Sequence, residues 1–253
     1  MNEMIHLPEN FQPKKNCLQD KIILVTGAGD GIGAVAAKTF AEYGATVILL
    51  GKTIPKLEKV YDEIVNAGHA QPAIIPLDLK LAKKEQFEEM AHKIENEFNH
   101  LDGVLHNAAI LAGLMPITQY DSELWNEVIQ VNLTAPFLLS QAMIPLLNKS
   151  TDTSMVFTSS GVAHRGVAYW GAYGVSKAAA DNLMGIIADE LEVNTSIRVN
   201  SIDPGRVRTR MRALAYPGED PMTLPLPQEL MPAYLYLMSD ESKDINGDIL
   251  LCQ

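Results

Sequence analysis

Cysteine is scarce in this sequence of 253 residues, which contains only Cys17 and Cys252. With one cysteine near each end, the chain has no framework of disulfide bonds, and a reducing compartment is the simplest setting. No cluster of His, Cys and Asp has the spacing of a metal site, so we expect no bound metal.

Long apolar runs are also lacking, because none approaches the roughly 18 residues that cross a membrane. The most apolar segment, residues 136–147 (PFLLSQAMIPLL), is interrupted by Ser140, Gln141 and Pro145. The N-terminal segment contains charges and prolines and lacks the apolar centre of a secretion signal. We therefore expect a soluble, cytoplasmic protein with no membrane partner.

Positive charge is in deficit, with 20 Lys and Arg against 31 Asp and Glu and a net charge of −11. Such a chain repels nucleic acid, so we expect no nucleic-acid partner. Hydrophobic residues make up 47% of the sequence. This content and the length suit one large α/β domain with a sizeable core.

Apolar, strand-like runs alternate with segments of helical periodicity such as 55–67 and 85–98. Runs rich in Val, Ile and Leu without polar alternation suit a parallel sheet covered on both faces. Strict alternation predicts an α/β, Rossmann-type doubly wound parallel sheet of about seven strands, in a single domain. The expected strands are Ile22–Val25, Thr46–Leu50, Ala73–Leu77, Leu101–His106, Ser154–Thr158, Ser196–Ile202 and Asp248–Cys252.

Two segments break this alternation. Residues 1–20 form a polar leader ahead of the domain at 21–253. Residues 206–228 are rich in proline and predict a long excursion that serves as a substrate lid. Alternating arginines in the lid could recognise an anionic substrate. Pairing with Glu219, Asp220 or a neighbouring subunit is the simpler interpretation. The arginines are Arg206, Arg208, Arg210 and Arg212.

A glycine-rich stretch, TGAGDGIG at 26–33, follows the first apolar run and opens an apolar helix. Gly27 permits a sharp turn, and Gly31 and Gly33 let backbone N–H groups approach a pyrophosphate. Taken alone, the stretch also suits an ordinary strand–helix turn.

The glycine spacing, preceded by Thr26, resembles the classical branch of the short-chain dehydrogenase/reductase family. Further family motifs follow in chain order and extend the resemblance over residues 20–252. They are Asp78 in PLDL, HNAA at 106–109, Asn132 in VNLTAPF, Ser160 in FTSS, Tyr173 and Lys177 in YGVSK, and Pro204 and Gly205 in DPGRVRT. The segments PGRVRTRMRA and MPAYLYLMSD resemble the bacterial YciK-like oxidoreductases of this family. The resemblance implies a Rossmann-type fold, a nicotinamide cofactor and a homodimer or homotetramer.

Tyr173 and Lys177 lie four residues apart in a helical segment and so share one face. A free tyrosine has a pKa near 10, and a nearby ammonium lowers it. A tyrosine tuned in this way can donate a proton to a carbonyl oxygen or take one from an alcohol. Ser160 can stabilise negative charge on the same oxygen. The resemblance implies that Asn132 holds a water molecule that links Lys177 to solvent.

The cofactor preference follows from the end of the second predicted strand. Gly51 stands where an NAD site usually has a carboxylate, and Lys52 can attract a 2′-phosphate. Asp30 would oppose that phosphate, so NADP is favoured and NAD stays possible. The motifs and the resemblance assign the cofactor to Gly27, Gly29, Asp30, Gly31, Ile32, Gly33, Lys52, Asp78, Leu79, Asn107, Ala108, Tyr173, Lys177, Pro204, Gly205, Val207 and Thr209.

The predicted substrate pocket is largely apolar with aromatic edges. His164 belongs either to this pocket or to a surface loop. His106 and Ala109 depart from the Asn and Gly of the family motif, which leaves the local backbone path open. The pocket residues are Ser160, Val162, His164, Trp170, Tyr173 and Met211.

These features predict an NAD(P)-dependent oxidoreductase that acts on a small-molecule carbonyl or secondary alcohol, with Tyr173 as general acid/base. The alternative is a non-catalytic dinucleotide-binding sensor with the same fold. An enoyl reductase is a third possibility, although the tyrosine and lysine of that branch are generally spaced more widely.

Overall fold

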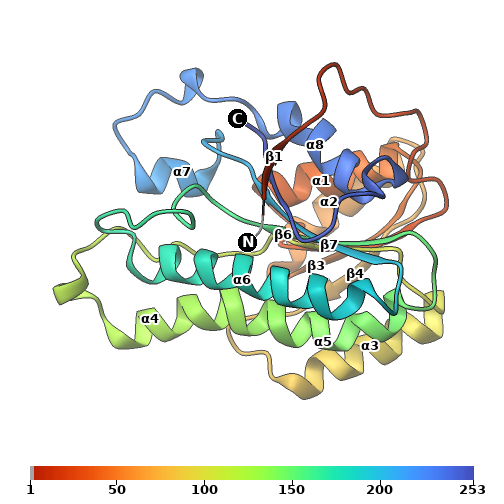
Figure 1. Ribbon diagram of the computed structural model, residues 1–253, viewed down its shortest axis with the longest axis horizontal. Helices are drawn as coiled ribbons and strands as arrows, with labels where there is room; N and C mark the ends of the chain where they lie inside the picture. Colours follow the sequence, from red (N-terminus) through yellow and green to blue (C-terminus); the bar gives the residue numbers. More distant parts are fainter. Residues whose placement is uncertain (1–2) are drawn as a thin grey trace.

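The computed structural model describes residues 3–253, which form one sheet of eight parallel strands flanked by helices (Figure 1). The strand order across the sheet is β1-β8-β7-β6-β5-β2-β3-β4. The strands are β1 (Met4–His6), β2 (Ile22–Thr26), β3 (Thr46–Gly51), β4 (Ala73–Pro76), β5 (Gly103–His106), β6 (Thr153–Thr158), β7 (Ile197–Asp203) and β8 (Ile249–Leu251).

Seven of these strands confirm the apolar runs of the sequence, and the Rossmann-type doubly wound sheet is confirmed with them. The eighth strand, β1, lies within the leader segment. It pairs in parallel with β8, in the register Met4 to Ile249. Leu18, from the same segment, is fully buried in the core. The leader is therefore an edge of the sheet and part of the packing.

Two layers of helices cover the sheet (Figure 1). Helices α1, α2 and α8 pack on one face, and α3, α5 and α6 pack on the other. The α-helices are α1 (Gly31–Glu42), α2 (Ile54–Asn66), α3 (Lys84–Phe98), α4 (Ser122–Ile129), α5 (Ala135–Leu147), α6 (Gly171–Glu192), α7 (Arg210–Ala215) and α8 (Met231–Met238). Burial on both faces explains why the central strands read as continuous apolar runs.

The helical run from Ser122 to Leu147 is long and apolar enough to cross a membrane by length and composition. Its apolar character has a source inside the fold. Leu139, Met143 and Leu147 are fully or almost fully buried against the sheet. The run is therefore accounted for as a core helix.

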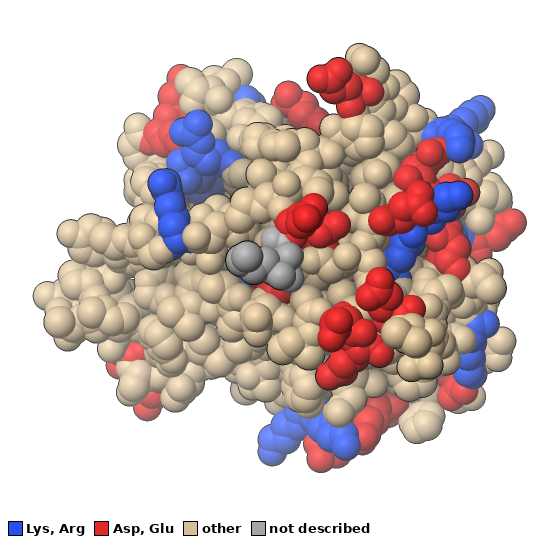
Figure 2. Space-filling view, in the orientation of Figure 1, with Lys and Arg blue, Asp and Glu red and all other residues tan. Residues whose placement is uncertain are grey.

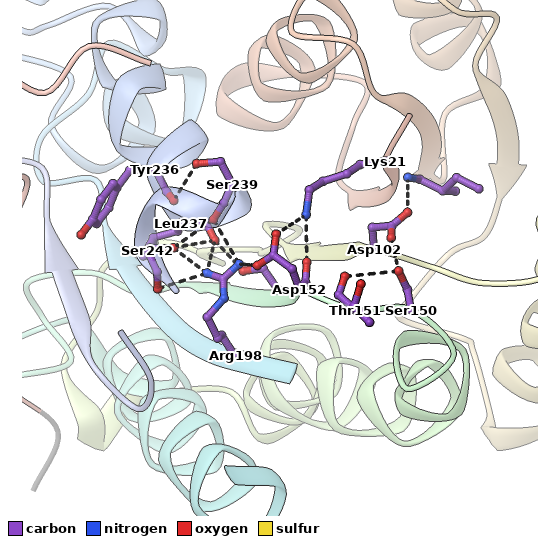
Figure 3. A network of polar contacts seen from close by, with 12 residues as sticks. Lys21, Asp102, Ser150, Thr151, Asp152, Arg198, Tyr236, Leu237, Ser239 and Ser242 are labelled. Carbon is purple, nitrogen blue, oxygen red and sulfur yellow. Dashed lines mark hydrogen bonds and ion pairs between the residues drawn. The ribbon is translucent and has the colours of Figure 1, made fainter. Parts of the chain in front are cut away.

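A network of polar contacts closes the amino edge of the sheet (Figure 3). The Arg198 guanidinium, at the start of β7, donates to Asp152 Oδ1 at 2.9 Å and to the Ser239 carbonyl at 3.1 Å. Lys21, just before β2, donates to Asp152 Oδ2 at 2.9 Å. A buried guanidinium needs such partners, because removing it from water is costly. This end of the sheet is therefore occupied by structural ion pairs.

The predicted lid at 206–228 has regular structure of its own. It contains α7 and two short 3-10 helices, η3 (Pro221–Thr223) and η4 (Pro227–Leu230). The Arg212 guanidinium donates to both carboxylate oxygens of Glu219, at 2.5 and 2.7 Å. The expected pairing with Glu219 is thus found for this arginine. Figure 2 shows basic side chains gathered around α7, while acidic side chains are spread over the rest of that face.

Candidate active site

The candidate site lies at the carboxyl edge of the sheet, between β2 and β5. From β2 the chain runs outward through β3 and β4, and then returns to place β5 on the other side of β2. The loops that follow β2 and β5 therefore diverge and leave a crevice at this switch point. Open α/β sheets bind their ligands in such crevices.

The glycine-rich turn packs so tightly that it has no space for side chains. Gly27 has a φ of +68°, a conformation that favours glycine. A Cβ atom on Gly33 would lie 2.4 Å from both Asn107 Nδ2 and the Gly27 carbonyl oxygen. The turn can thus bring its backbone N–H groups and the start of α1 against a phosphate. These residues fit the pyrophosphate of a dinucleotide.

Thr26 fixes the loop after β5 to this turn, a role that our sequence analysis did not assign. Its hydroxyl accepts from the N–H groups of Asn107 and Ala108, at 2.9 and 3.0 Å. The Asn107 amide in turn donates to the Thr26 carbonyl at 3.1 Å. The only signal in the sequence is the position of Thr26, directly before the first glycine. Asn107 and Ala108 therefore border the turn, as the cofactor assignment requires.

Asp30 caps α1 and is paired. Its carboxylate accepts from the Gly31 N–H at 2.8 Å and from Lys56 Nζ at 2.5 Å. The hydrogen bond from Lys56 lowers the pKa of Asp30. Lys52 lies exposed just after β3. The negative charge expected to oppose a 2′-phosphate is thus offset by Lys56.

Two further segments contribute to the predicted cofactor set. Asp78 and Leu79 lie in the turn after β4, where Asp78 accepts from the Lys80 N–H at 3.1 Å. In the segment after β7, Thr209 caps α7 by accepting from the Arg212 N–H. A Cβ atom on Gly31 would lie 3.9 Å from the Thr209 methyl group. The segment after β7 therefore meets the glycine-rich turn. Ile32 and Val207 pack into the core beneath it.

Helix α6 presents Tyr173 and Lys177 on one face, as the four-residue spacing predicts. Both side chains are almost fully buried. Lys177 Nζ donates to the Thr158 carbonyl at 2.6 Å and lies 5.8 Å from the centre of the Tyr173 ring. The Ser160 side chain, from the loop after β6, lies close enough to the Tyr173 phenol to lower its pKa. Phenol, hydroxyl and amine thus meet at the carboxyl edge.

Burial is the largest influence on the pKa values of Tyr173 and Lys177. Burial raises the pKa of Tyr173 to about 12, against a lowering by the Ser160 side chain and with a smaller raising by the negative charge of Asp203. Burial lowers the pKa of Lys177 to about 8. The net shift of Tyr173 is the reverse of the one expected from Lys177. The phenolate loses more by leaving water than it gains from an ammonium that is turned toward Thr158.

Asn132 lies in a single π-helical turn, Gln130–Thr134, between α4 and α5. Its amide accepts from the Ile110 N–H at 2.9 Å and donates to the Ile110 carbonyl at 3.0 Å. It also donates to Ser176 Oγ at 3.1 Å. Asn132 therefore ties the loop after β5 to α6, beside Lys177.

The predicted substrate residues divide into two groups. Val162, Trp170 and Met211 pack with Tyr173 in a small apolar cluster. The Trp170 ring lies 5.5 Å from the Tyr173 ring and 6.2 Å from that of Tyr216 in the lid. The apolar wall with aromatic edges is thus present. His164, in the loop that follows Val162, lies against acidic side chains instead.

His164 turns toward two carboxylates. Its Nε2 lies 3.4 Å from Asp203 Oδ2, and its Nδ1 lies 3.9 Å from Asp181 Oδ2. The side chain is 17% exposed. The imidazole therefore lies mostly buried in the loop between β6 and α6, next to two acidic side chains.

His106 does not disturb the backbone of β5, which stays in register with β6. Its ring stacks on Phe157 with centroids 4.3 Å apart, and Nε2 is hydrogen-bonded to Ser140 Oγ at 3.0 Å. Full burial lowers the pKa of His106 to about 3. A neutral imidazole thus replaces the amide of the family motif.

The comparisons with known proteins agree with this geometry. Residues 21–220 match the family model described as short chain dehydrogenase. The oxidoreductase YciK of Escherichia coli strain K12 is 48% identical over 238 residues, which cover 94% of each chain. The chain belongs to the short-chain dehydrogenase family.

Solved structures of short-chain dehydrogenases resemble this fold closely. One from Salmonella enterica serovar Typhi CT18 is 48% identical, with a TM-score of 0.94, and the match covers 96% of this chain and 100% of that chain. One from Escherichia coli CFT073, complexed with NADPH, is 47% identical, with a TM-score of 0.93 over 95% and 100% of the two chains. The predicted membership of the family, close to YciK, is confirmed.

Proposed function

We propose that this protein interconverts a carbonyl compound and a secondary alcohol, with NADP as cofactor and Tyr173 as general acid/base. One observation carries the proposal. The phenol of Tyr173, the side chain of Ser160 and the amine of Lys177 gather at the same carboxyl edge of the sheet as a glycine-rich turn that has no space for side chains. A binding protein without turnover has no need of such a group.

The cofactor, when bound, supplies or accepts the hydride. The glycine-rich turn would hold its pyrophosphate, and the segment from Pro204 to Thr209 would border its nicotinamide end. The chain's own part is to place the substrate carbon and to move a proton. Membership of the family and the NADPH complex of the Escherichia coli relative support this assignment.

In the direction of reduction, Tyr173 Oη gives its proton to the substrate oxygen as that oxygen becomes an alcohol. The Ser160 hydroxyl donates a hydrogen bond to the same oxygen and stabilises its developing negative charge. Lys177 returns a proton to Tyr173, with Asn132 positioning the water that connects the amine to solvent. Positive charge close to the phenol lowers its pKa from the value of about 12 set by burial.

The preference for NADP rests on the end of β3 and the start of α1. Lys52 and Lys56 place two ammonium groups there, and Lys56 offsets the charge of Asp30. No carboxylate of β3 competes for the ribose, because Gly51 ends that strand. We expect tighter binding of NADP than of NAD in a fluorescence titration, and the reverse order would contradict this part of the proposal.

The same resemblance supports a homodimer or homotetramer in the cytoplasm. The outer faces of α5 and α6 carry the exposed apolar side chains of Phe137, Val175 and Ile186. Sedimentation velocity measures the oligomeric state, and a monomer would contradict this expectation.

Turnover of a panel of carbonyls and alcohols, followed by the absorbance of the reduced cofactor, tests the proposed reaction. Tyr173→Phe keeps the ring and removes the proton, so we expect activity to fall at least a hundredfold while NADP still binds. Equal activity in the variant would refute the role of Tyr173. Tight NADP binding without turnover of any substrate would favour the dinucleotide sensor.

A further inference from the structure

A buried acidic cluster lies close enough to Lys177 to interact with its charge. It consists of Asp181, one helical turn further along α6, Asp203 at the end of β7, and His164 between them. The side chains of both aspartates are only 8% exposed. Carboxylates are rarely buried without partners that hold them there. The position of this cluster therefore calls for a role.

Asp181 is held by two hydroxyl groups. Its Oδ2 accepts from Ser159 Oγ at 2.5 Å, and its Oδ1 accepts from Ser201 Oγ at 2.7 Å. Ser159 directly precedes Ser160, and Ser201 lies in β7. The contacts fix the carboxylate in relation to both the reactive hydroxyl and the neighbouring strand.

Asp203 joins the cluster to the cofactor site. Its Oδ1 accepts from the Gly205 N–H at 2.9 Å, inside the turn that borders the nicotinamide end. Its Oδ2 faces His164 Nε2 at 3.4 Å. One carboxylate thus contacts both the turn and the imidazole.

Both carboxylates act on Lys177, whose amine is buried. Burial lowers the pKa of Lys177, and the negative charges of Asp181 and Asp203 raise it. The other groups that face the amine supply no negative charge: the Thr158 carbonyl of β6, the phenol of Tyr173 and the neutral ring of His106 on β5. The two aspartates are therefore the groups that keep the amine charged near neutral pH.

We propose that Asp181 and Asp203 are positioning residues that keep Lys177 charged beside Tyr173, and that Asp203 couples this charge to the Pro204–Gly205 turn. The inference rests on the proposed function, because it assigns these aspartates to the proton transfer by Tyr173. His164 lies between the two carboxylates, with Nδ1 3.9 Å from Asp181 Oδ2 and Nε2 3.4 Å from Asp203 Oδ2.

The direct test is the titration of Lys177, followed by NMR in protein labelled with 13C at the lysine side chains. The Lys177 resonance is assigned by its loss in Lys177→Arg. We expect the pKa of the amine, about 8 in the wild-type protein, to fall by about one pH unit in Asp203→Asn and in Asp181→Asn. The alkaline limb of the activity profile should move to lower pH by a similar amount.

Asp102→Asn is the matched control. Asp102 is also buried, and it accepts from the Ile22 N–H at 2.8 Å, but it lies at the opposite edge of the sheet. This variant loses the same charge and should leave the titration of Lys177 unchanged. A merely structural role for Asp203 would lower the melting temperature without moving the titration.

An unchanged Lys177 titration in both variants would overturn the inference. If one variant does not fold, the other decides. If neither variant folds, the titration of Lys177 in the wild-type protein tests the inference. An amine pKa well below 8 would show that the carboxylates do not offset the effect of burial, and would overturn the inference. The NMR result does not depend on turnover. Absence of activity would therefore refute the proposed function alone, while the titration still tests the role of the aspartates.

Discussion

Single residues set how closely the backbone of the glycine-rich turn can approach a ligand. Gly33 is the tightest case, since a Cβ atom there would overlap Asn107 and the Gly27 carbonyl. Neither neighbour can yield easily, because Asn107 is hydrogen-bonded to Thr26 and the carbonyl is backbone. The turn and the loop after β5 would have to separate to admit a methyl group.

Gly33→Ala is therefore expected to lower the free energy of unfolding by about 1–3 kcal/mol and to weaken NADP binding at least tenfold. Gly166→Ala is the control, because a Cβ atom on Gly166 would meet no atom within 4 Å. Urea unfolding and a fluorescence titration with NADP measure the two effects. Equal NADP affinity in the two variants would contradict the close approach inferred for this turn.

At this scale the sequence could propose site residues, but it could not predict their energetics. Glycine spacing and the Tyr173–Lys177 spacing depend only on local geometry, so the sequence displays them. The direction of the pKa shift of Tyr173 depends on burial by segments far apart in the chain. His164 lies near two aspartates, Asp181 from α6 and Asp203 from β7. No spacing in the sequence predicts that these three residues meet.

At the scale of elements, the π-helical turn between α4 and α5 is the clearest irregularity with a function in the fold. It directs the Asn132 amide toward both backbone polar groups of Ile110. Asparagine is a weak helix former, so helix stability does not explain its presence here. The irregular turn therefore serves to hold the loop after β5 in place through the Asn132 side chain.

Asn132→Ala should lower the free energy of unfolding by about 2–3 kcal/mol, because it leaves the N–H and carbonyl of Ile110 without partners. Asn126→Ala, on the exposed side of α4, provides the matched control and should change stability little. Denaturant titration of both variants gives the comparison. Equal losses would mean that the amide of Asn132 does not hold the loop.

Elements with strong apolar runs were predictable, and the shorter ones were not. The central strands lie under helices on both faces, so most of their residues are apolar, and the polar ones in β7, such as Arg198 and Ser201, are paired. Strand β1 has three residues, and its partner β8 lies at the other end of the chain. The lid contains regular structure that proline-rich composition concealed, because α7 is a helix of only six residues.

At the scale of the whole molecule, the buried imidazole of His106 links stability to pH. The unfolded chain binds a proton at this group near pH 6.5, whereas the folded protein does so only near pH 3. Between these values the unfolded state holds more protons, so stability rises with pH and is lost on acidification.

When the pH falls from 7 to 4.5, the free energy of unfolding should decrease in both proteins. We expect the decrease in His106→Asn to be smaller than in the wild-type protein by about 2 kcal/mol. His92→Asn removes an exposed imidazole and should follow the wild-type curve. Thermal unfolding at a series of pH values measures the slopes. Parallel curves for all three proteins would show that His106 does not govern the acid response.

The pairing of β1 with β8 also constrains how the chain can fold during synthesis. The register joins Met4 to Ile249, so β1 cannot take its place in the sheet until β8 has been made. Until then the edge of β7 stays open and able to pair with another chain. Completion of the sheet must therefore wait for the synthesis of β8, and an edge that can pair with another chain is exposed in the meantime.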